Sequence, residues 1–114
     1  MSKRIQRVNE LLKKEVSQLL LKEIEFPGDI LATITRVQTR PDLRETIIFV
    51  SVMPEEKRDK ILNLLTKRAS FLQQKINKRL KMKFIPRIIF REETKTAEAG
   101  RIEEILEELK KGKE

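Results

Sequence analysis

Two strand-like segments on either side of a short polar turn limit the possible folds of this chain more than any other feature. The segment ILATITRVQT (30–39) mixes Ile, Thr and Val, and ETIIFVSVM (45–53) is denser still in β-branched residues. Such side chains favour the extended backbone of a sheet. The connecting RPDLRE (40–45) places Pro and Asp where a tight turn accepts them. The sequence therefore predicts an antiparallel hairpin.

Amphipathic helical patterns flank this hairpin. Residues 3–22 repeat apolar side chains at spacings of three and four, which places them on one helix face. Residues 54–80 do the same, but the register stumbles between Leu65 and Phe71, so we interpret them as two helices with a kink or tight turn at Ala69–Ser70. A last apolar pattern predicts a helix at 99–111.

The third strand fixes the topology. MKFIPRIIF (82–90) reads as a strand, and Pro86 favours an edge position or a bulge. A strand–helix pair–strand connection makes the second and third strands parallel, with a right-handed crossover. The predicted fold is α+β, with the order α-β-β-α-kink-α-β-α, a three-stranded mixed sheet and helices on one face. We expect one domain at 1–111 and a short C-terminal tail at 112–114.

Composition excludes most catalytic chemistry. The 114 residues include no Cys and no His, and Gly28, Gly100 and Gly112 are too far apart for a phosphate-cradling loop. We expect no enzyme activity, no metal and no cofactor. No apolar run reaches the length of a membrane span, and the polar MSKRIQRVNE start lacks a signal-peptide core. We therefore expect a cytoplasmic protein without a membrane partner.

The net charge of +8 favours a polyanionic partner, nucleic acid first. Residues 67–91 contain nine Lys or Arg and no Asp or Glu. Arg68, Lys75 and Arg79 are spaced to share a helix face, and a kink beside them leaves N–H donors that suit phosphate. The candidate RNA-binding residues are Arg4, Arg7, Lys67, Arg68, Ser70, Lys75, Lys78, Arg79, Lys81 and Lys83.

Other interpretations stay open at this point. Lys and Arg also populate ordinary solvated helix faces. The aromatic residues of the basic segment, Phe71, Phe84 and Phe90, are expected in the core, so contacts to RNA backbone and shape are favoured over base reading. The last helix carries Glu103, Glu104, Glu107 and Glu108, which repel phosphate. We expect it to face away from RNA, and a protein–protein adaptor acting through it is an alternative.

The order of elements resembles a type II KH domain, but the GXXG loop of that domain is missing, since no Gly occurs from 54 to 91. Four stretches are similar, in order and spacing, to the opening helix, hairpin, third strand and closing helix of the ribosome-binding factor A family. They are RIQRVNELLKKEVSQLLLKEI, ATITRVQTRPDLRETIIFVSV, FIPRIIFREE and EAGRIEEILEEL. In that family an Ala-x-Gly kink replaces the loop. Here Arg68-Ala69-Ser70 takes its place, and we expect the Ser70 hydroxyl to cap the second helix.

The resemblance implies a non-catalytic, bacterial ribosome biogenesis factor. Such a protein binds the immature small (30S) ribosomal subunit through 16S rRNA, assists late maturation and rRNA processing, and then leaves. We expect a monomer with no small-molecule substrate. A general KH-type RNA-binding module without a ribosome role is the alternative.

Overall fold

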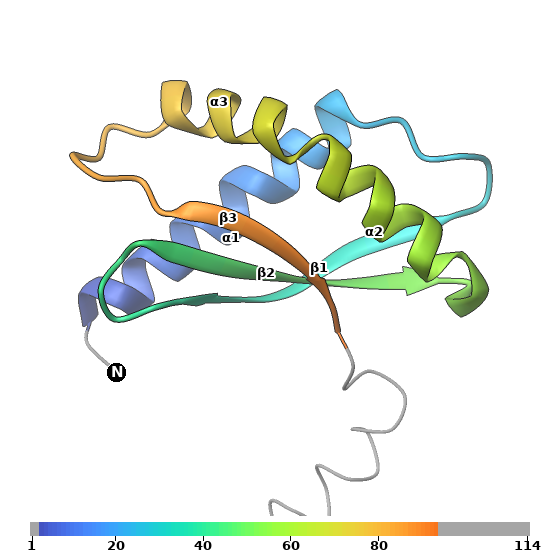
Figure 1. The fold of residues 1–114 in the computed structure, drawn as a ribbon, viewed down its shortest axis with the longest axis horizontal. Helices are drawn as coiled ribbons and strands as arrows, with labels where there is room; N and C mark the ends of the chain where they lie inside the picture. Colours follow the sequence, from blue (N-terminus) through green and yellow to red (C-terminus); the bar gives the residue numbers. More distant parts are fainter. Residues whose placement is uncertain (1–2, 94–114) are drawn as a thin grey trace, which may run out of the picture.

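The computed structural model describes residues 3–93, which form a mixed three-stranded sheet with helices on one face (Figure 1). The elements follow in the order α1 (Lys3–Glu23), β1 (Leu31–Thr39), β2 (Glu45–Met53), a 3₁₀ turn η1 (Glu55–Lys57), α2 (Arg58–Lys67), α3 (Ala69–Arg79) and β3 (Arg87–Glu92). This order confirms the α+β prediction. The helix expected at 99–111 lies outside the described residues.

The sheet has the predicted connectivity. Its strand order is β1-β2-β3, with β1 antiparallel and β3 parallel to β2. The hairpin closes through a backbone hydrogen bond from Arg40 N–H to the Glu45 carbonyl (2.9 Å). Within the turn, Leu43 takes a positive φ of 62°, and the Asp42 carboxylate accepts the N–H of Arg44 (3.0 Å). Asp is common in turns because its short side chain can satisfy a backbone donor two residues on.

A β-bulge in β1 explains why its apolar pattern is not a strict alternation. The pairing runs Ile34 to Val50 and then Arg36 to Phe49, so Thr35 is the extra residue. An extra residue shifts the later side chains to the opposite phase. Ile34 and Val37, three apart in sequence, therefore both contribute to the core on the helix side of the sheet.

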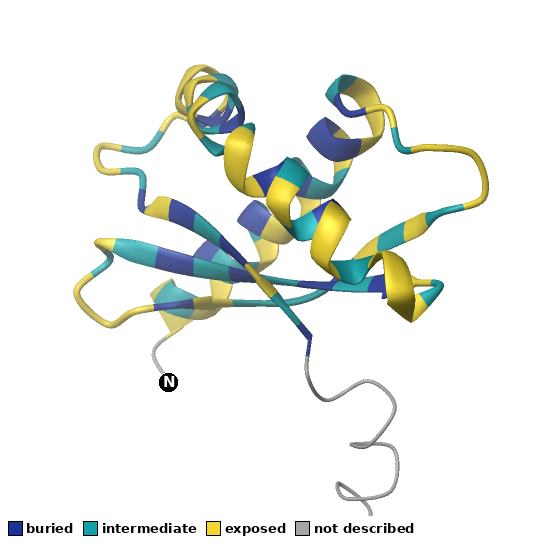
Figure 2. Ribbon diagram, turned by 45° about the vertical axis from the view of Figure 1, so that its right-hand side comes forward, coloured by how far each residue is buried: buried dark blue, intermediate teal, exposed yellow. Residues whose placement is uncertain are grey.

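The core lies between the sheet and the three helices. Alternate residues of β2, from Thr46 to Val52, are buried against the helices. Figure 2 shows the buried segments of α1, α2 and α3 turned toward the sheet. The apolar side chains that lose all exposure in this layer are Leu12, Val16, Ile48, Val50, Ile61, Leu65, Leu72 and Ile76. The core is aliphatic, as the scarcity of aromatic residues predicts.

The break between α2 and α3 falls at Arg68, one residue earlier than expected. Arg68 has φ −94° and ψ 2°, and its N–H still donates to the Leu64 carbonyl (3.0 Å). Ser70 therefore lies inside the first turn of α3, and its side chain makes no capping hydrogen bond. The prediction that Ser70 caps this helix is wrong, because the cap position is already occupied by Arg68.

The third strand begins at Arg87 and not at Met82. Proline has no N–H, so Pro86 cannot donate to a neighbouring strand. The first backbone bond to the hairpin is Arg87 N–H to the Arg44 carbonyl (2.9 Å). Residues 80–86 form a connecting loop, and β3 is an edge strand, as Pro86 indicated.

Candidate nucleic-acid interface

A ridge of cations runs from the α2–α3 break along the outer side of α3. We define this basic ridge as Lys67, Arg68, Lys75 and Lys78. The partly buried ring of Phe71 lies beneath it, with Arg68 Cζ 4.5 Å and Lys75 Nζ 5.4 Å from the ring centroid. Cations at these distances are attracted by the ring face. Phe71 therefore holds two cationic side chains in place at the surface.

Arg79 does not join this ridge. Its Nε donates to Glu15 Oε1 (2.8 Å) and its guanidinium also donates to Gln18 Oε1 (3.0 Å), both on α1. Arg79 follows the buried Leu72 and Ile76 at helical spacing, which turns its side chain toward α1. Arg79 is exposed, but its guanidinium is bound to two side chains of α1, whereas no ion pair holds the cations of the ridge within residues 3–93.

Ser70 faces another side of α3. It borders a shallow hollow together with Ala69, Gln73 and Arg87. Gln73 fixes the start of β3 here, since its amide accepts the N–H of Ile88 (2.8 Å) and donates to the Pro86 carbonyl (3.2 Å). Of the predicted set, Ser70 thus lies beside β3, while Arg68 and Lys75 lie on Phe71.

The start of α1 meets the loop after α3. Arg4 and Arg7 line a hollow that also contains Met82, which lies between the exposed Lys81 and Lys83. The fold thus brings together cations that are far apart in the sequence. We define this loop-end cluster as Arg4, Arg7, Lys81 and Lys83.

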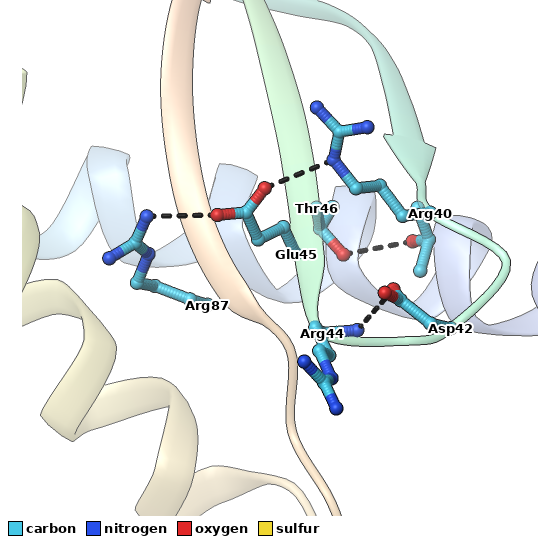
Figure 3. Close-up of polar contacts among 7 residues, drawn as sticks. Arg40, Asp42, Arg44, Glu45, Thr46 and Arg87 are labelled. Atoms are coloured by element: carbon cyan, nitrogen blue, oxygen red, sulfur yellow. Dashed lines mark hydrogen bonds and ion pairs between the residues drawn. The ribbon is translucent and has the colours of Figure 1, made fainter.

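Three further cations, at the adjoining tip of the hairpin, were missed from the sequence. Glu45 pairs with both Arg40 (3.0 Å) and Arg87 (2.9 Å), while Arg44 extends away from it (Figure 3). The turn composition drew attention to Pro41 and Asp42 and not to these charges. The available signal was the parallel pairing of β3 with β2, which sets Arg87 opposite Glu45.

Ion pairing separates the basic ridge and the loop-end cluster from the other cations. Arg36 pairs with Glu93 (3.0 Å) and Arg58 with Glu92 (2.5 Å), both at the far end of β3. By contrast, within residues 3–93 no carboxylate lies within ion-pair distance of the basic ridge or of the loop-end cluster. The acidic Glu55, Glu56 and Asp59 lie at the start of η1 and α2, the end of α2 farthest from the break. The two groups therefore form a surface with unneutralised positive charge.

Two other kinds of site do not occur in the described part of the chain. Residues 3–93 contain no group of three or more His, Cys, Asp or Glu that could hold a metal ion. None of the helices formed by these residues is long and apolar enough to cross a membrane. The positive surface is thus the feature of these residues that points most directly to a partner.

The fold and this surface define the class: a type II KH-like domain whose two central helices meet at a kink without a GXXG loop. The family model described as ribosome-binding factor A matches residues 4–106. The chain belongs to the ribosome-binding factor A family. This membership confirms the predicted family and the interpretation of the chain as a ribosome-binding factor and not an enzyme.

Individual proteins agree with this assignment. The chain is 35% identical over 112 residues to ribosome-binding factor A of Halothermothrix orenii, covering 97% of this chain and 92% of that protein. Among solved structures, the crystal structure of ribosome-binding factor A from Thermus thermophilus has a TM-score of 0.67 at 19% identity, over 77% of this chain and 94% of the other. A homology model of the Thermus thermophilus factor, fitted into a cryo-EM map of a complex with 30S, has a TM-score of 0.61 at 23% identity. That match covers 73% of this chain and 88% of the other.

Proposed function

We propose that this protein is a ribosome assembly factor. It binds the immature 30S subunit through 16S rRNA, assists late maturation and rRNA processing, and is then released. It acts in the bacterial cytoplasm as a monomer, with residues 1–111 as one domain, 112–114 as a tail, and no cofactor. The observation that carries the proposal is the set of cations along the basic ridge and the loop-end cluster that have no ion-pair partner within residues 3–93.

The arrangement suits contacts to an RNA backbone. Lys75 and Lys78 present ammonium groups along one helix face, and Arg68 is oriented by the Phe71 ring. The helix break adds a second kind of donor, because α3 begins at Ala69 and the first N–H groups of a helix have no acceptor within that helix. Ammonium, guanidinium and helix-start N–H groups all bind phosphate oxygens.

The complex formed by a relative supports the choice of RNA. The Thermus thermophilus factor has been placed in a complex with 30S. The present chain belongs to the same family, and its own helix pair carries a positive outer surface. A partner that consists largely of RNA phosphate is the natural counterpart of such a surface.

The test is a charge-removal experiment with a matched control. The triple variant Lys67→Gln, Lys75→Gln, Lys78→Gln removes three exposed or partly exposed charges from the ridge. The control variant Lys22→Gln, Lys57→Gln, Lys60→Gln removes the same charge from exposed positions elsewhere. Co-sedimentation with immature small subunits is measured as a function of salt concentration.

We expect the ridge variant to bind subunits more weakly and to lose about one in salt slope for each phosphate contact removed. The control should follow the wild type. Equal losses in both variants would mean that only net charge matters. Wild-type binding by the ridge variant would place the RNA on another surface.

A further inference from the structure

The most exposed aromatic side chain of the described chain lies at the tip of the loop between α3 and β3. Phe84 is 67% exposed, whereas the sequence pattern assigned it to the core. The start of β3 at Arg87 explains the difference, since Phe84 lies in the loop and not in a strand with one buried face. A single exposed apolar side chain is common at a protein surface, so the residues around Phe84 decide whether it has a binding role.

Phe84 forms one wall of a hollow between two segments that are distant in the sequence. The hollow measures about 400 Å³ and is lined by Asp42, Leu43 and Arg44 of the hairpin turn and by Phe84 and Ile85 of the loop. The backbone bond from Arg87 N–H to the Arg44 carbonyl holds the two segments together. The walls are therefore an aromatic ring, two aliphatic side chains, a carboxylate and a guanidinium.

The charges at this hollow favour an anionic occupant with a flat ring. Lys83 Nζ lies over the Phe84 ring, 5.7 Å from its centroid, so a cation faces the aromatic wall. Arg44 extends away from Glu45 in Figure 3, and no carboxylate within residues 3–93 forms an ion pair with it. The Asp42 carboxylate is fixed by the Arg44 N–H (3.0 Å) and retains lone pairs that can accept from base N–H groups.

We propose that this hollow binds one unpaired nucleotide of the RNA, with its base stacked on Phe84 and its phosphate held by Lys83 or Arg44. The inference rests on the proposed function, because the RNA must already lie along the loop-end cluster, of which Lys83 is a member. It adds a contact that a regular RNA duplex cannot make, since paired bases are not available for stacking on a side chain. Stacking on an aromatic ring is tolerant of base identity, so the hollow selects single-stranded structure and not a particular sequence.

The composition of the chain allows a direct test. It contains no Trp and no Tyr, so Phe84→Trp introduces the only tryptophan. Indole fluorescence is quenched when a base stacks on the ring. We expect quenching with single-stranded oligoadenylate and with immature small subunits. Blunt RNA duplex and heparin should bind in a salt-sensitive manner without quenching. Leu21→Trp is the matched control, since Leu21 is 85% exposed near the C-terminal end of α1, and it should report no quenching.

Affinity gives a second readout. Phe84→Ala should lower the affinity for oligoadenylate by about five-fold or more, while Phe84→Tyr retains it and heparin binding stays constant. Because the side chain is exposed, both variants should unfold at the wild-type temperature.

The outcomes separate this inference from the proposed function. Oligoadenylate that binds without changing the fluorescence, or with equal affinity for Phe84→Ala, overturns the inference alone. The inference is also overturned if Phe84→Ala loses subunit binding while its affinity for oligoadenylate is unchanged. That result would place Phe84 against a ribosomal protein. A wild-type protein that binds neither RNA nor subunits overturns both.

Discussion

At the scale of single residues, the role of a Lys or Arg side chain follows from its partners in the fold and not from its charge alone. Arg79 belongs to the acid-free run of the sequence, yet in the fold it faces Glu15, which lies 64 positions earlier in the chain. Lys78, its neighbour, is exposed. One of these adjacent residues therefore joins two helices, and the other remains available for phosphate.

We expect Arg79→Gln to destabilise the fold by about 1 kcal/mol, because it removes a charge-assisted contact between α3 and α1. Lys78→Gln should change the free energy of unfolding by less than about 0.5 kcal/mol, since Lys78 is exposed and forms no ion pair within residues 3–93. Urea denaturation of the two variants measures both values. The double variant Glu15→Gln, Arg79→Gln should lose less than the sum of its single variants. Additive losses would show that the pair is not coupled.

A buried polar contact fixes α1 against the sheet. The Asn9 amide oxygen accepts the N–H of Thr39 (2.9 Å) and its hydroxyl, and that hydroxyl lies 2.9 Å from the hydroxyl of Thr46. We expect Asn9→Ala to cost about 2 kcal/mol, because it leaves the Thr39 N–H without its acceptor and leaves the Thr39 hydroxyl only its contact with Thr46. Gln6→Ala, at an exposed position of α1, is the control for helix propensity. If the two variants unfold at the same denaturant concentration, the Asn9 contact contributes nothing.

At the scale of elements, the local patterns predicted most of the fold. The segment 45–53 matches β2, and the helical pattern at 3–22 ends one residue before α1 does. These elements follow from side-chain type and period, which are properties of neighbouring residues. The early start assigned to β3 was wrong because its true start depends on Gln73, which binds Pro86 and Ile88 from another element. A hydrogen bond between distant elements produces no periodic pattern in the sequence.

The candidate site was predictable only in part. The sequence indicated the basic segment, and the fold places Arg68, Lys75 and Lys78 on one outer surface. The sequence did not indicate that Arg4 and Arg7 lie close to Met82, or that Phe84 is exposed. Both depend on how a loop packs against a distant helix or turn.

The break between α2 and α3 tolerates changes at Ser70. This residue lies in the first turn of α3 and makes no capping bond, so Ser70→Ala should leave the unfolding temperature unchanged or raise it slightly, by helix propensity. Ser70→Gly should lower stability by about 0.5 kcal/mol, because Gly has the lower helix propensity. Thermal unfolding followed by circular dichroism measures both. If Ser70→Ala costs about 1 kcal/mol, the hydroxyl caps the helix after all.

At the scale of the whole molecule, positive and negative side chains lie in separate regions of the described surface. The basic ridge and the loop-end cluster are positive, while the acidic residues of η1 and early α2 lie at the end of α2 farthest from the break. Such a separation orients an approaching polyanion before any contact forms. We expect the ridge and the loop-end cluster to bind one RNA, since α3 connects them directly.

Removing charge from each group in turn tests whether one RNA spans both. Lys75→Gln with Lys78→Gln removes two charges from the ridge, and Lys81→Gln with Lys83→Gln removes two from the loop-end cluster. If one RNA contacts both groups, each pair should reduce the salt slope of subunit binding by about two, and the quadruple variant by about four. Losses of binding free energy from the two pairs should add, because the side chains share no partner in the described structure. Lys57→Gln with Lys60→Gln controls for net charge. A quadruple variant that binds like one of the double variants would show that the RNA uses only one of the two groups.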